Sequence, residues 1–384
     1  MTNASPPQAS PPLEGFVAPG LEPVRDQLLA HFAADEELGA QIAATIDGDV
    51  VLAVAAGFAD QARATPMTRT TLVPVFSCSK PMAALAVAWL ADQGRLDYDQ
   101  PVSDLWPEFA AEGKGAITIA QALSHQAGVP GFRDGWSGVD WYDQEKSARA
   151  VAAMAPFWEP GTATGYHPIS WGVIAAEIVR RAGDGRSLGV ILGEELAGPA
   201  GADVWIGLPE REHGRVAEIR RPRAMPDFGE INAATQAAFL EKWSSPTGTP
   251  ALFRTAEIPA ANGHATALGL ATLAQAYARD GRIGDAHPIG GGAIVQATAE
   301  RAHGQDLVLP AVVSMGAGLL RNRPDRPLYG PGTASVGHTG HGGSCVMADP
   351  ERRLTFSYVM NRQSNHLVID PRADRLITAL YRAL

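Results

Sequence analysis

The chain has 384 residues, of which 46% are hydrophobic and 19% charged, and its formal net charge is −10. This length accommodates one large domain or two closely packed ones around a sizeable core. The acidic balance excludes a typical nucleic-acid binder, and the only two cysteines, Cys78 and Cys345, exclude both a disulfide framework and a four-ligand cysteine zinc site.

The N-terminal segment is rich in proline and serine and has neither a basic cluster nor a long apolar stretch. We therefore predict a flexible tail over residues 1–20 rather than a signal peptide. No apolar run reaches the ~18 residues that a membrane span requires, so we expect a cytoplasmic protein with no membrane partner.

After the tail, the hydrophobic pattern predicts a helix over 22–33 and then a hairpin whose strands, 40–46 and 50–56, flank the turn Asp47-Gly48-Asp49. In the middle of the chain, the hydrophobic pattern predicts further helices over 117–124, 169–182, 188–196 and 268–279. Between them, residues 209–263 are irregular, with six prolines and one short helix near 233–243. The end of the chain predicts strands over 311–319, 334–338, 344–348 and 354–359, and a closing helix over 371–384.

Strands at both ends with helices between them predict an α+β fold, in which one antiparallel sheet is built from both termini and flanked by helices. We expect an α/β domain formed by residues 21–76 and 290–384. The mainly helical and loop region 77–289 is expected to be inserted into it as a second domain.

The stretch Val75-Phe76-Ser77-Cys78-Ser79-Lys80 leads an apolar, β-branched segment into a helix-forming run. If the helix begins near Ser77, then Ser77 and Lys80 lie on one face, one turn apart. A serine needs a neighbouring base to act as a nucleophile, and a lysine with a lowered pKa can provide one. The alternative is an N-capping serine beside a solvated lysine. Ser79 has no lysine three residues later.

Two later stretches carry further candidate residues. Residues 159–168 form a turn-rich loop that presents Tyr166 just before the predicted helix at 169. Residues 337–344, Gly-His-Thr-Gly-His-Gly-Gly-Ser, form a glycine-rich strand or strand edge containing His338, Thr339, Gly340 and His341.

With these three ordered motifs, the chain resembles the serine β-lactamase and penicillin-recognising superfamily, and most closely the family VIII carboxylesterases, which share the class C β-lactamase fold. The resemblance runs from the first helix through Asn361. Its flanking stretches are 123–128 (Leu-Ser-His-Gln-Ala-Gly), 160–167, 347–350 (Met-Ala-Asp-Pro) and 358–361 (Tyr-Val-Met-Asn). It implies a serine hydrolase that needs no cofactor or metal and acts on a small-molecule ester, with the active site between the two domains.

The resemblance also implies a role for each residue. Ser77 would attack the ester and carry the acyl group, while Lys80 and Tyr166 would act as general base and acid. Because a phenol has a pKa near 10, Tyr166 is expected to need the help of the Lys80 cation. The backbone N–H groups of Ser77 and His341 would form the oxyanion hole, and residues 338–341 would bind substrate.

Two positions depart from the β-lactamase pattern. His338 stands where that family has the lysine of Lys-Thr-Gly, so the permanent cation for a β-lactam carboxylate is missing. Tyr166-His167-Pro168 stands where it has Tyr-x-Asn, so the amide that holds a β-lactam side chain is also missing. Both changes favour a neutral ester over an anionic β-lactam, and we expect short-chain carboxylic esters to be the substrates.

The sequence also allows other functions. The same residues could serve a β-lactamase-like amide hydrolase or an acyltransferase, or a non-catalytic sensor that is merely acylated. The chain lacks the G-x-S-x-G of an α/β-hydrolase. His338 and His341 have no third ligand at metal-site spacing, and His125 fits a structural turn better than a general base. The sequence pattern favours neither a monomer nor a homo-oligomer.

Overall fold

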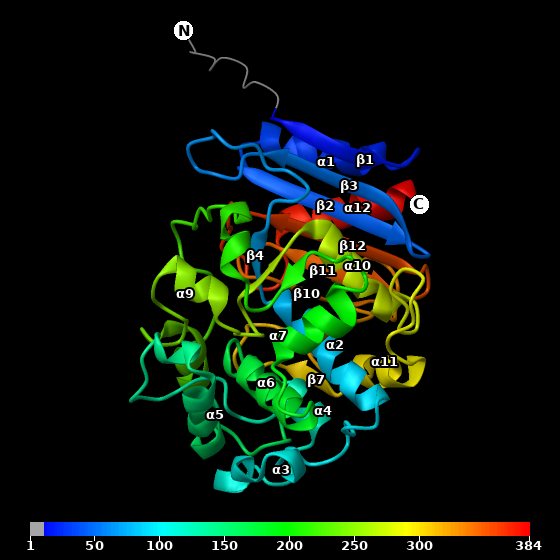
Figure 1. Cartoon of the computed structure of the whole chain (residues 1–384). Helices are drawn as coiled ribbons and strands as arrows, with labels where there is room; N and C mark the ends of the chain where they lie inside the picture. The colour runs from blue at the N-terminus through cyan, green and yellow to red at the C-terminus, as the bar shows by residue number, and fades with distance from the viewer. Residues whose placement is uncertain (1–10) are drawn as a thin grey trace.

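The structure, a computed structural model, describes residues 11–384 and contains one large antiparallel sheet covered by helices (Figure 1). Its nine strands lie in the order β1 (Leu13–Val17), β3 (Asp49–Gly57), β2 (Gly39–Ile46), β12 (Leu354–Met360), β11 (Cys345–Asp349), β10 (Val336–Thr339), β9 (Leu319–Arg321), β8 (Val312–Gly316) and β7 (Ala302–Gln305). The two ends of the chain meet where β2 pairs with β12. This confirms the predicted α+β fold with a sheet built from both termini.

The edge strand β1 corrects one expectation. The sequence predicts that residues 13–17 belong to the flexible tail, but they pair with β3, Leu13 lying opposite Ala56 and Val17 opposite Leu52. The side chains of β1 are mostly exposed, so it is held by backbone pairing and has no buried face for a hydrophobic pattern to reveal. Residues 1–10 of the expected tail lie outside the described residues.

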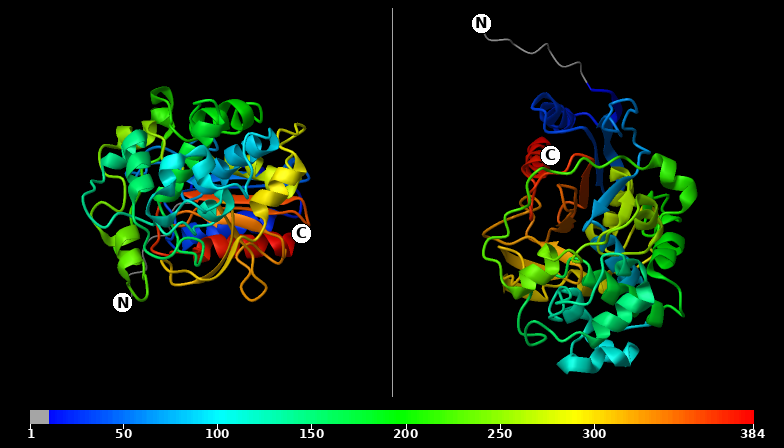
Figure 2. Two further views of the ribbon diagram at one scale, coloured as in Figure 1. Left: turned by 90° about the horizontal axis from the view of Figure 1, so that it is seen from below. Right: turned by 90° about the vertical axis from the view of Figure 1, so that its left-hand side faces the viewer.

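Helices cover the two faces of the sheet in separate layers, as the right-hand view of Figure 2 shows. On one face, α1 (Glu22–Ala33) and α12 (Pro371–Ala383) bury the apolar side chains of β12, such as Phe356 and Tyr358. On the other face, α2 (Ser79–Asp92) and α10 (Ala267–Ala278) pack against the sheet. Here the hydroxyls of Thr355 and Ser357 donate to backbone carbonyls of α10, which draws that helix close to β12.

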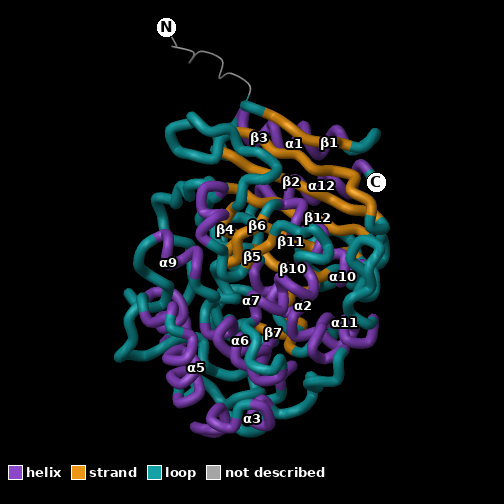
Figure 3. The backbone as a smooth tube through the Cα atoms, in the orientation of Figure 1, coloured by secondary structure: helices purple, strands orange, loops and turns teal. Residues whose placement is uncertain are grey.

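The remaining elements surround α2, and most of the helices among them lie in the lower half of Figures 1 and 3. A second sheet has the order β4 (Val73–Phe76), β6 (Gly263–Ala265) and β5 (Val204–Trp205). The further α-helices are α3 (Val102–Leu105), α4 (Ile119–Leu123), α5 (Gln144–Ala153), α6 (Ser170–Ala182), α7 (Leu188–Ile191), α8 (Ala233–Thr235), α9 (Pro250–Thr255) and α11 (Gly291–Thr298). Short 3₁₀ segments are η1 (Pro107–Gly113), η2 (Asp140–Tyr142) and η4 (Glu210–Arg215), and π segments are η3 (Leu192–Ala197) and η5 (Gln236–Leu240).

Helices and strands that have a clear hydrophobic periodicity or turn signal in the sequence lie where the sequence predicts them. The helix over 22–33 has the predicted bounds, and the hairpin around Asp47-Gly48 is formed by β2 and β3. The predicted helix near 233–243 is shorter, because it ends at Leu240 in a π turn. Across residues 11–384, every helix falls short of the length and apolarity that crossing a bilayer demands.

Candidate active site

Ser77 lies in the tight turn that joins β4 to α2. The helix begins at Ser79, two residues later than the sequence analysis assumed, and Phe76 before it adopts a left-handed backbone with φ +48°. Such a backbone is strained for a non-glycine residue and persists where its surroundings fix it. The Ser79 side chain fixes the Phe76 backbone, because its hydroxyl donates to the Phe76 carbonyl and accepts from the N–H of Gly263 at 2.8 Å. Ser79 is therefore a structural residue, and Ser77 is the hydroxyl left at the turn.

The Ser77 hydroxyl is approached by two donors from different elements. Tyr166, in the loop before α6, donates to Ser77 Oγ at 2.7 Å, and Lys80 Nζ, in the first turn of α2, lies 3.2 Å from the same atom. The Lys80 amine also lies 4.7 Å from the centroid of the Tyr166 ring. The structure thus brings together the three residues to which the resemblance gives catalytic roles.

Lys80 is fully buried and has no carboxylate partner among residues 11–384. Its other two hydrogen bonds go to neutral carbonyls, those of Pro168 and Ala260, both at 3.0 Å. Burial lowers the pKa of Lys80 well below that of a free lysine, since the charged form loses its water without gaining an anion. A neutral amine, the form that can accept a proton, is thereby favoured.

The surroundings of Tyr166 do not favour its ionisation, although the sequence analysis expects the Lys80 cation to help the phenol lose its proton. Burial raises the pKa of Tyr166 above 10, and the Ser77 hydrogen bond opposes this only in part. The phenol therefore keeps its proton and acts as a donor. Its backbone is fixed by Asp306, whose Oδ1 accepts from the N–H groups of Tyr166, Val308 and Leu309 at 2.7–3.0 Å. Sequence reasoning missed Asp306, which lies 140 residues from Tyr166.

Two buried histidines join the loop that carries Tyr166 to the loop at 125–129. His125 Nδ1 accepts from the backbone N–H of His167 at 3.0 Å, and His167 Nε2 accepts from the N–H of Val129 at 3.0 Å. His167 Nδ1 lies 2.5 Å from the carbonyl of Gly165 and so carries the ring proton. His125 has φ +67°, and burial lowers the pKa of both rings, that of His167 to about 3. The prediction that His125 is a turn residue is confirmed, and His167 shares that structural role.

The glycine-rich stretch forms the end of β10 and a turn over residues 340–343, hereafter the 340–343 turn. It abuts β4 closely, because a Cβ on Gly340 would lie only 2.3 Å from the carbonyl oxygen of Val75. Cys78 Sγ, beside Ser77, donates to the carbonyl of His338 at 3.4 Å. Within residues 11–384, neither the Ser77 N–H nor the His341 N–H donates a hydrogen bond to a protein group. Both are available to a substrate oxygen.

Comparison with known proteins agrees with this geometry. The Beta-lactamase family model matches residues 25–379. The chain belongs to the β-lactamase family. It is 30% identical over 351 residues to Esterase/beta-lactamase LipL of Mycobacterium tuberculosis, an alignment that spans 87% of this chain and 80% of the relative.

Two solved structures resemble this β-lactamase family member along nearly its whole length. A novel penicillin-binding protein homologue from Caulobacter crescentus has a TM-score of 0.94 and 49% identity, covering 97% of this chain and 100% of the other. A family VIII carboxylesterase has a TM-score of 0.90 and 39% identity, with the same coverage. The family model and the names of these relatives agree with the superfamily that the three sequence motifs predict.

The residue in the family's lysine position, His338, carries no charge at neutral pH. It is 3% exposed, and burial together with the nearby Lys80 lowers its pKa to about 3. Its Nδ1 lies 2.8 Å from the carbonyl of Thr339 and so bears the ring proton. Its Nε2 is a buried acceptor without a protein partner among the described residues.

Aromatic side chains from the irregular 209–263 region approach the site. The ring of Phe239 lies parallel to that of Tyr166 with centroids 6.4 Å apart, and Phe228 contacts Phe239 at 4.9 Å. Next to the 340–343 turn, Phe76 meets the His341 ring edge to face at 5.7 Å. The rings of Phe239 and Phe76 thus supply apolar surface beside Tyr166 and His341.

Proposed function

We propose that this β-lactamase family protein is a carboxylesterase that hydrolyses short-chain, neutral esters through an acyl-enzyme on Ser77. The observation that carries the proposal is the pair of hydrogen bonds to Ser77 Oγ, from Tyr166 at 2.7 Å and Lys80 at 3.2 Å. A buried lysine without a counter-charge supports it, because such an amine is available as a base.

Acylation follows from these contacts. Neutral Lys80 takes the Ser77 proton as Oγ forms a bond to the ester carbonyl carbon. The carbonyl oxygen becomes an oxyanion and accepts from the N–H groups of Ser77 and His341, each such donor being worth about 3–4 kcal/mol of barrier. As the carbon–oxygen bond to the alcohol breaks, Tyr166 protonates the leaving oxygen and regains a proton from the Lys80 ammonium.

Deacylation runs through the same groups in reverse. Lys80 removes a proton from a water molecule while the water oxygen attacks the acyl carbon, and the N–H groups of Ser77 and His341 again hold the oxyanion. The bond to Ser77 Oγ then breaks, and Oγ recovers its proton from the Lys80 ammonium. The acid is released, and Ser77, Lys80 and Tyr166 are restored.

The polarity of the site supports a neutral substrate. His338 is uncharged where the β-lactamases of this fold have lysine, and Pro168 contributes only a carbonyl where they have asparagine. The apolar surface of Phe239 beside Tyr166 suits a short acyl chain or an aryl leaving group. We therefore expect β-lactams to be poor substrates.

The test is steady-state hydrolysis of p-nitrophenyl acetate, butyrate and octanoate, with nitrocefin in parallel. Ser77→Ala should abolish turnover, whereas the matched control Ser103→Ala should keep it, because the Ser103 hydroxyl, in α3, donates to the carbonyl of Gly115 and has no contact with Ser77. Turnover that survives Ser77→Ala would place the nucleophile elsewhere. A nitrocefin kcat/KM equal to that for the aryl esters would favour a β-lactamase, and a single burst without turnover would favour an acylated sensor.

A further inference from the structure

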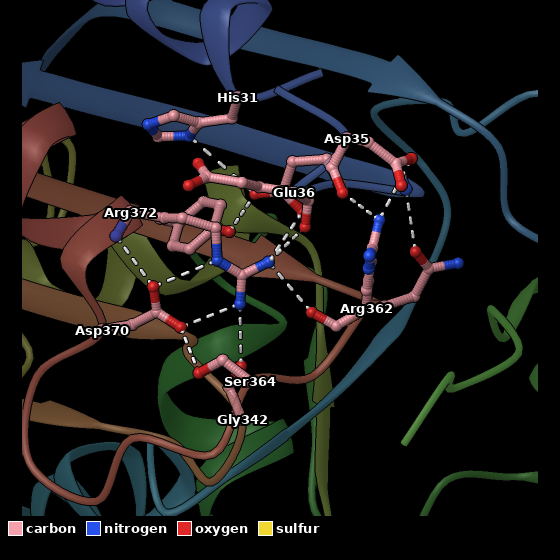
Figure 4. A network of polar contacts seen from close by, with 12 residues as sticks. His31, Asp35, Glu36, Gly342, Arg362, Ser364, Asp370 and Arg372 are labelled. Atoms are coloured by element: carbon pink, nitrogen blue, oxygen red, sulfur yellow. Dashed lines mark hydrogen bonds and ion pairs between the residues drawn. The ribbon is translucent and has the colours of Figure 1, made fainter. Parts of the chain in front are cut away.

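A buried ionic cluster lies directly behind the 340–343 turn (Figure 4). Its centre is Arg372, in the first turn of α12, whose side chain is 6% exposed. The guanidinium donates to both oxygens of Asp370, at 3.0 and 2.8 Å, and to Glu37 at 3.1 Å, and these two carboxylates are essentially inaccessible to solvent. Buried ion pairs add little stability compared with apolar packing of the same volume, so the arrangement calls for another explanation.

The same guanidinium reaches the turn. Arg372 Nη2 donates to the carbonyl of Gly342 at 3.0 Å, which also accepts from the N–H of Ser364 at 2.9 Å. The preceding carbonyl, that of His341, accepts from Gln363 Nε2 at 3.1 Å. A Cβ on Gly343, where φ is +131°, would lie 2.6 Å from Asp370 Oδ2 and 2.8 Å from Arg372 Nη2. The turn is therefore seated directly on the cluster.

These contacts orient the N–H of His341. The carbonyl of Gly340 accepts from the N–H of Gly343 at 3.0 Å, so that carbonyl points into the turn. In a planar trans peptide the N–H points opposite to the carbonyl, so the N–H of His341 points out of the turn. With the carbonyls of His341 and Gly342 held from behind, the peptide planes on both sides of the turn have little freedom to rotate.

We propose that Arg372, braced by Asp370 and Glu37 and assisted by Gln363, is a positioning residue that keeps the His341 N–H directed at the ester oxygen bound by Ser77. This inference rests on the proposed esterase function. The oxyanion forms only in the transition state, so we expect the cluster to stabilise the transition state and to have little effect on the binding of the ester itself.

The expected magnitude follows from the worth of an oxyanion donor. Removing one such donor costs about 10²–10³-fold in kcat, and a donor that is tilted rather than removed loses part of that. Loosening the 340–343 turn should therefore lower kcat by about 10–100-fold while KM changes by less than about threefold.

Two variants loosen the turn in different ways. Arg372→Lys keeps a positive charge between the carboxylates but replaces the five-donor fork with a single amine. Gln363→Met leaves the cluster intact and removes only the donor to the His341 carbonyl. The matched control is Arg375→Gln on the same helix, since Arg375 contacts His31 at 3.2 Å and Glu36, and has no contact with the turn.

Each variant is assayed for hydrolysis of p-nitrophenyl butyrate, and its active sites are counted by labelling the serine with a fluorophosphonate. Inhibition by butylboronic acid is measured in the same assay. The boronate adds to the serine oxygen and mimics the tetrahedral oxyanion, so its Ki reports the oxyanion hole without turnover. We expect Arg372→Lys and Gln363→Met to lose kcat per active site and to raise the boronate Ki in parallel, with Arg375→Gln within twofold of wild type.

The proposal is overturned if both turn variants match Arg375→Gln in kcat and boronate Ki, even where their melting temperatures fall. If Arg372→Lys does not fold, Gln363→Met decides alone. Failure of the proposed function is recognised separately, because then wild type itself would show no turnover that depends on Ser77.

Discussion

Acid should destabilise this protein strongly, because several histidines are buried in their neutral form. Burial lowers the pKa of His31 and His264 to about 4 and that of His167 and His338 to about 3. In the unfolded chain each of these would titrate near pH 6.5. Since the folded-state pKa is the lower one, the stability that each contributes is complete above pH 6.5 and is lost as the pH falls toward 4.

The size of this loss follows from those values. At pH 5 each of the four histidines favours the unfolded chain by about 2 kcal/mol relative to pH 7.5, or about 8 kcal/mol together. Glu37 acts in the opposite direction, because burial raises its pKa to about 7 and the folded protein therefore binds a proton more readily than the unfolded chain. Between pH 7.5 and pH 5 this adds about 2 kcal/mol to the stability. The net loss of about 6 kcal/mol is comparable with the whole stability of a typical domain, about 5–15 kcal/mol.

His264 offers a clean test of this reasoning. It is fully buried in β6, and neither ring nitrogen has a hydrogen-bond partner among the described residues. His264→Leu should therefore keep most of the stability at pH 7.5. Urea unfolding followed by tryptophan fluorescence at pH 7.5 and 5.0 should show a pH-dependent loss about 2 kcal/mol smaller than in wild type. The exposed His366 provides the control His366→Leu. An equal loss in His264→Leu and wild type would refute the argument.

Two further predictions concern the site itself. Tyr166→Phe removes the donor 2.7 Å from Ser77 Oγ, so kcat for p-nitrophenyl butyrate should fall by about 10²–10⁴-fold with little change in KM, and a kcat within tenfold of wild type would rule out Tyr166 as the acid. Gly340→Ala places a Cβ 2.3 Å from the Val75 carbonyl, so the 340–343 turn must move away from β4. Both kcat and the melting temperature should fall, and an unchanged kcat would show that the close approach is not needed.

Short-range signals account for what could be predicted from the sequence. The helix over 22–33 and the hairpin around Asp47-Gly48 follow from periodicity and turn chemistry within a few residues. Ser77 and Lys80 lie three positions apart, so a single tight turn of the chain, closed by the N–H of Lys80 donating to the carbonyl of Ser77 at 3.0 Å, is enough to bring them together. The approach of Tyr166 could not be derived from its own stretch of sequence, and only the family resemblance indicated it.

What the sequence does not reveal depends on pairs that are distant in the chain. Asp306 holds Tyr166 across 140 residues, and Arg372 holds Gly342 across 30, in each case through a backbone group that any residue could supply. No local pattern distinguishes such a carboxylate or guanidinium from a solvated one. The left-handed backbone of Phe76 is likewise imposed by its neighbours, because a phenylalanine does not favour it.

The burial of Lys80 also predicts how activity depends on pH. The amine serves as a base only when neutral, and burial lowers its pKa below that of a free lysine, so kcat/KM should rise with pH and level off below the usual lysine range. Lys80→Arg, whose guanidinium stays charged, should lose at least about 10²-fold in kcat/KM at every pH.

Protonation of Lys80 and acid unfolding both reduce activity, but they differ in the time needed for recovery. After a jump from acid to pH 8, activity lost through Lys80 returns within the mixing time, because a proton transfer is fast. Activity lost through the buried histidines returns only as fast as the chain refolds, together with its tryptophan fluorescence. If activity followed the folded fraction alone at every pH, and Lys80→Arg stayed active, then a neutral Lys80 would not be the base that activates Ser77.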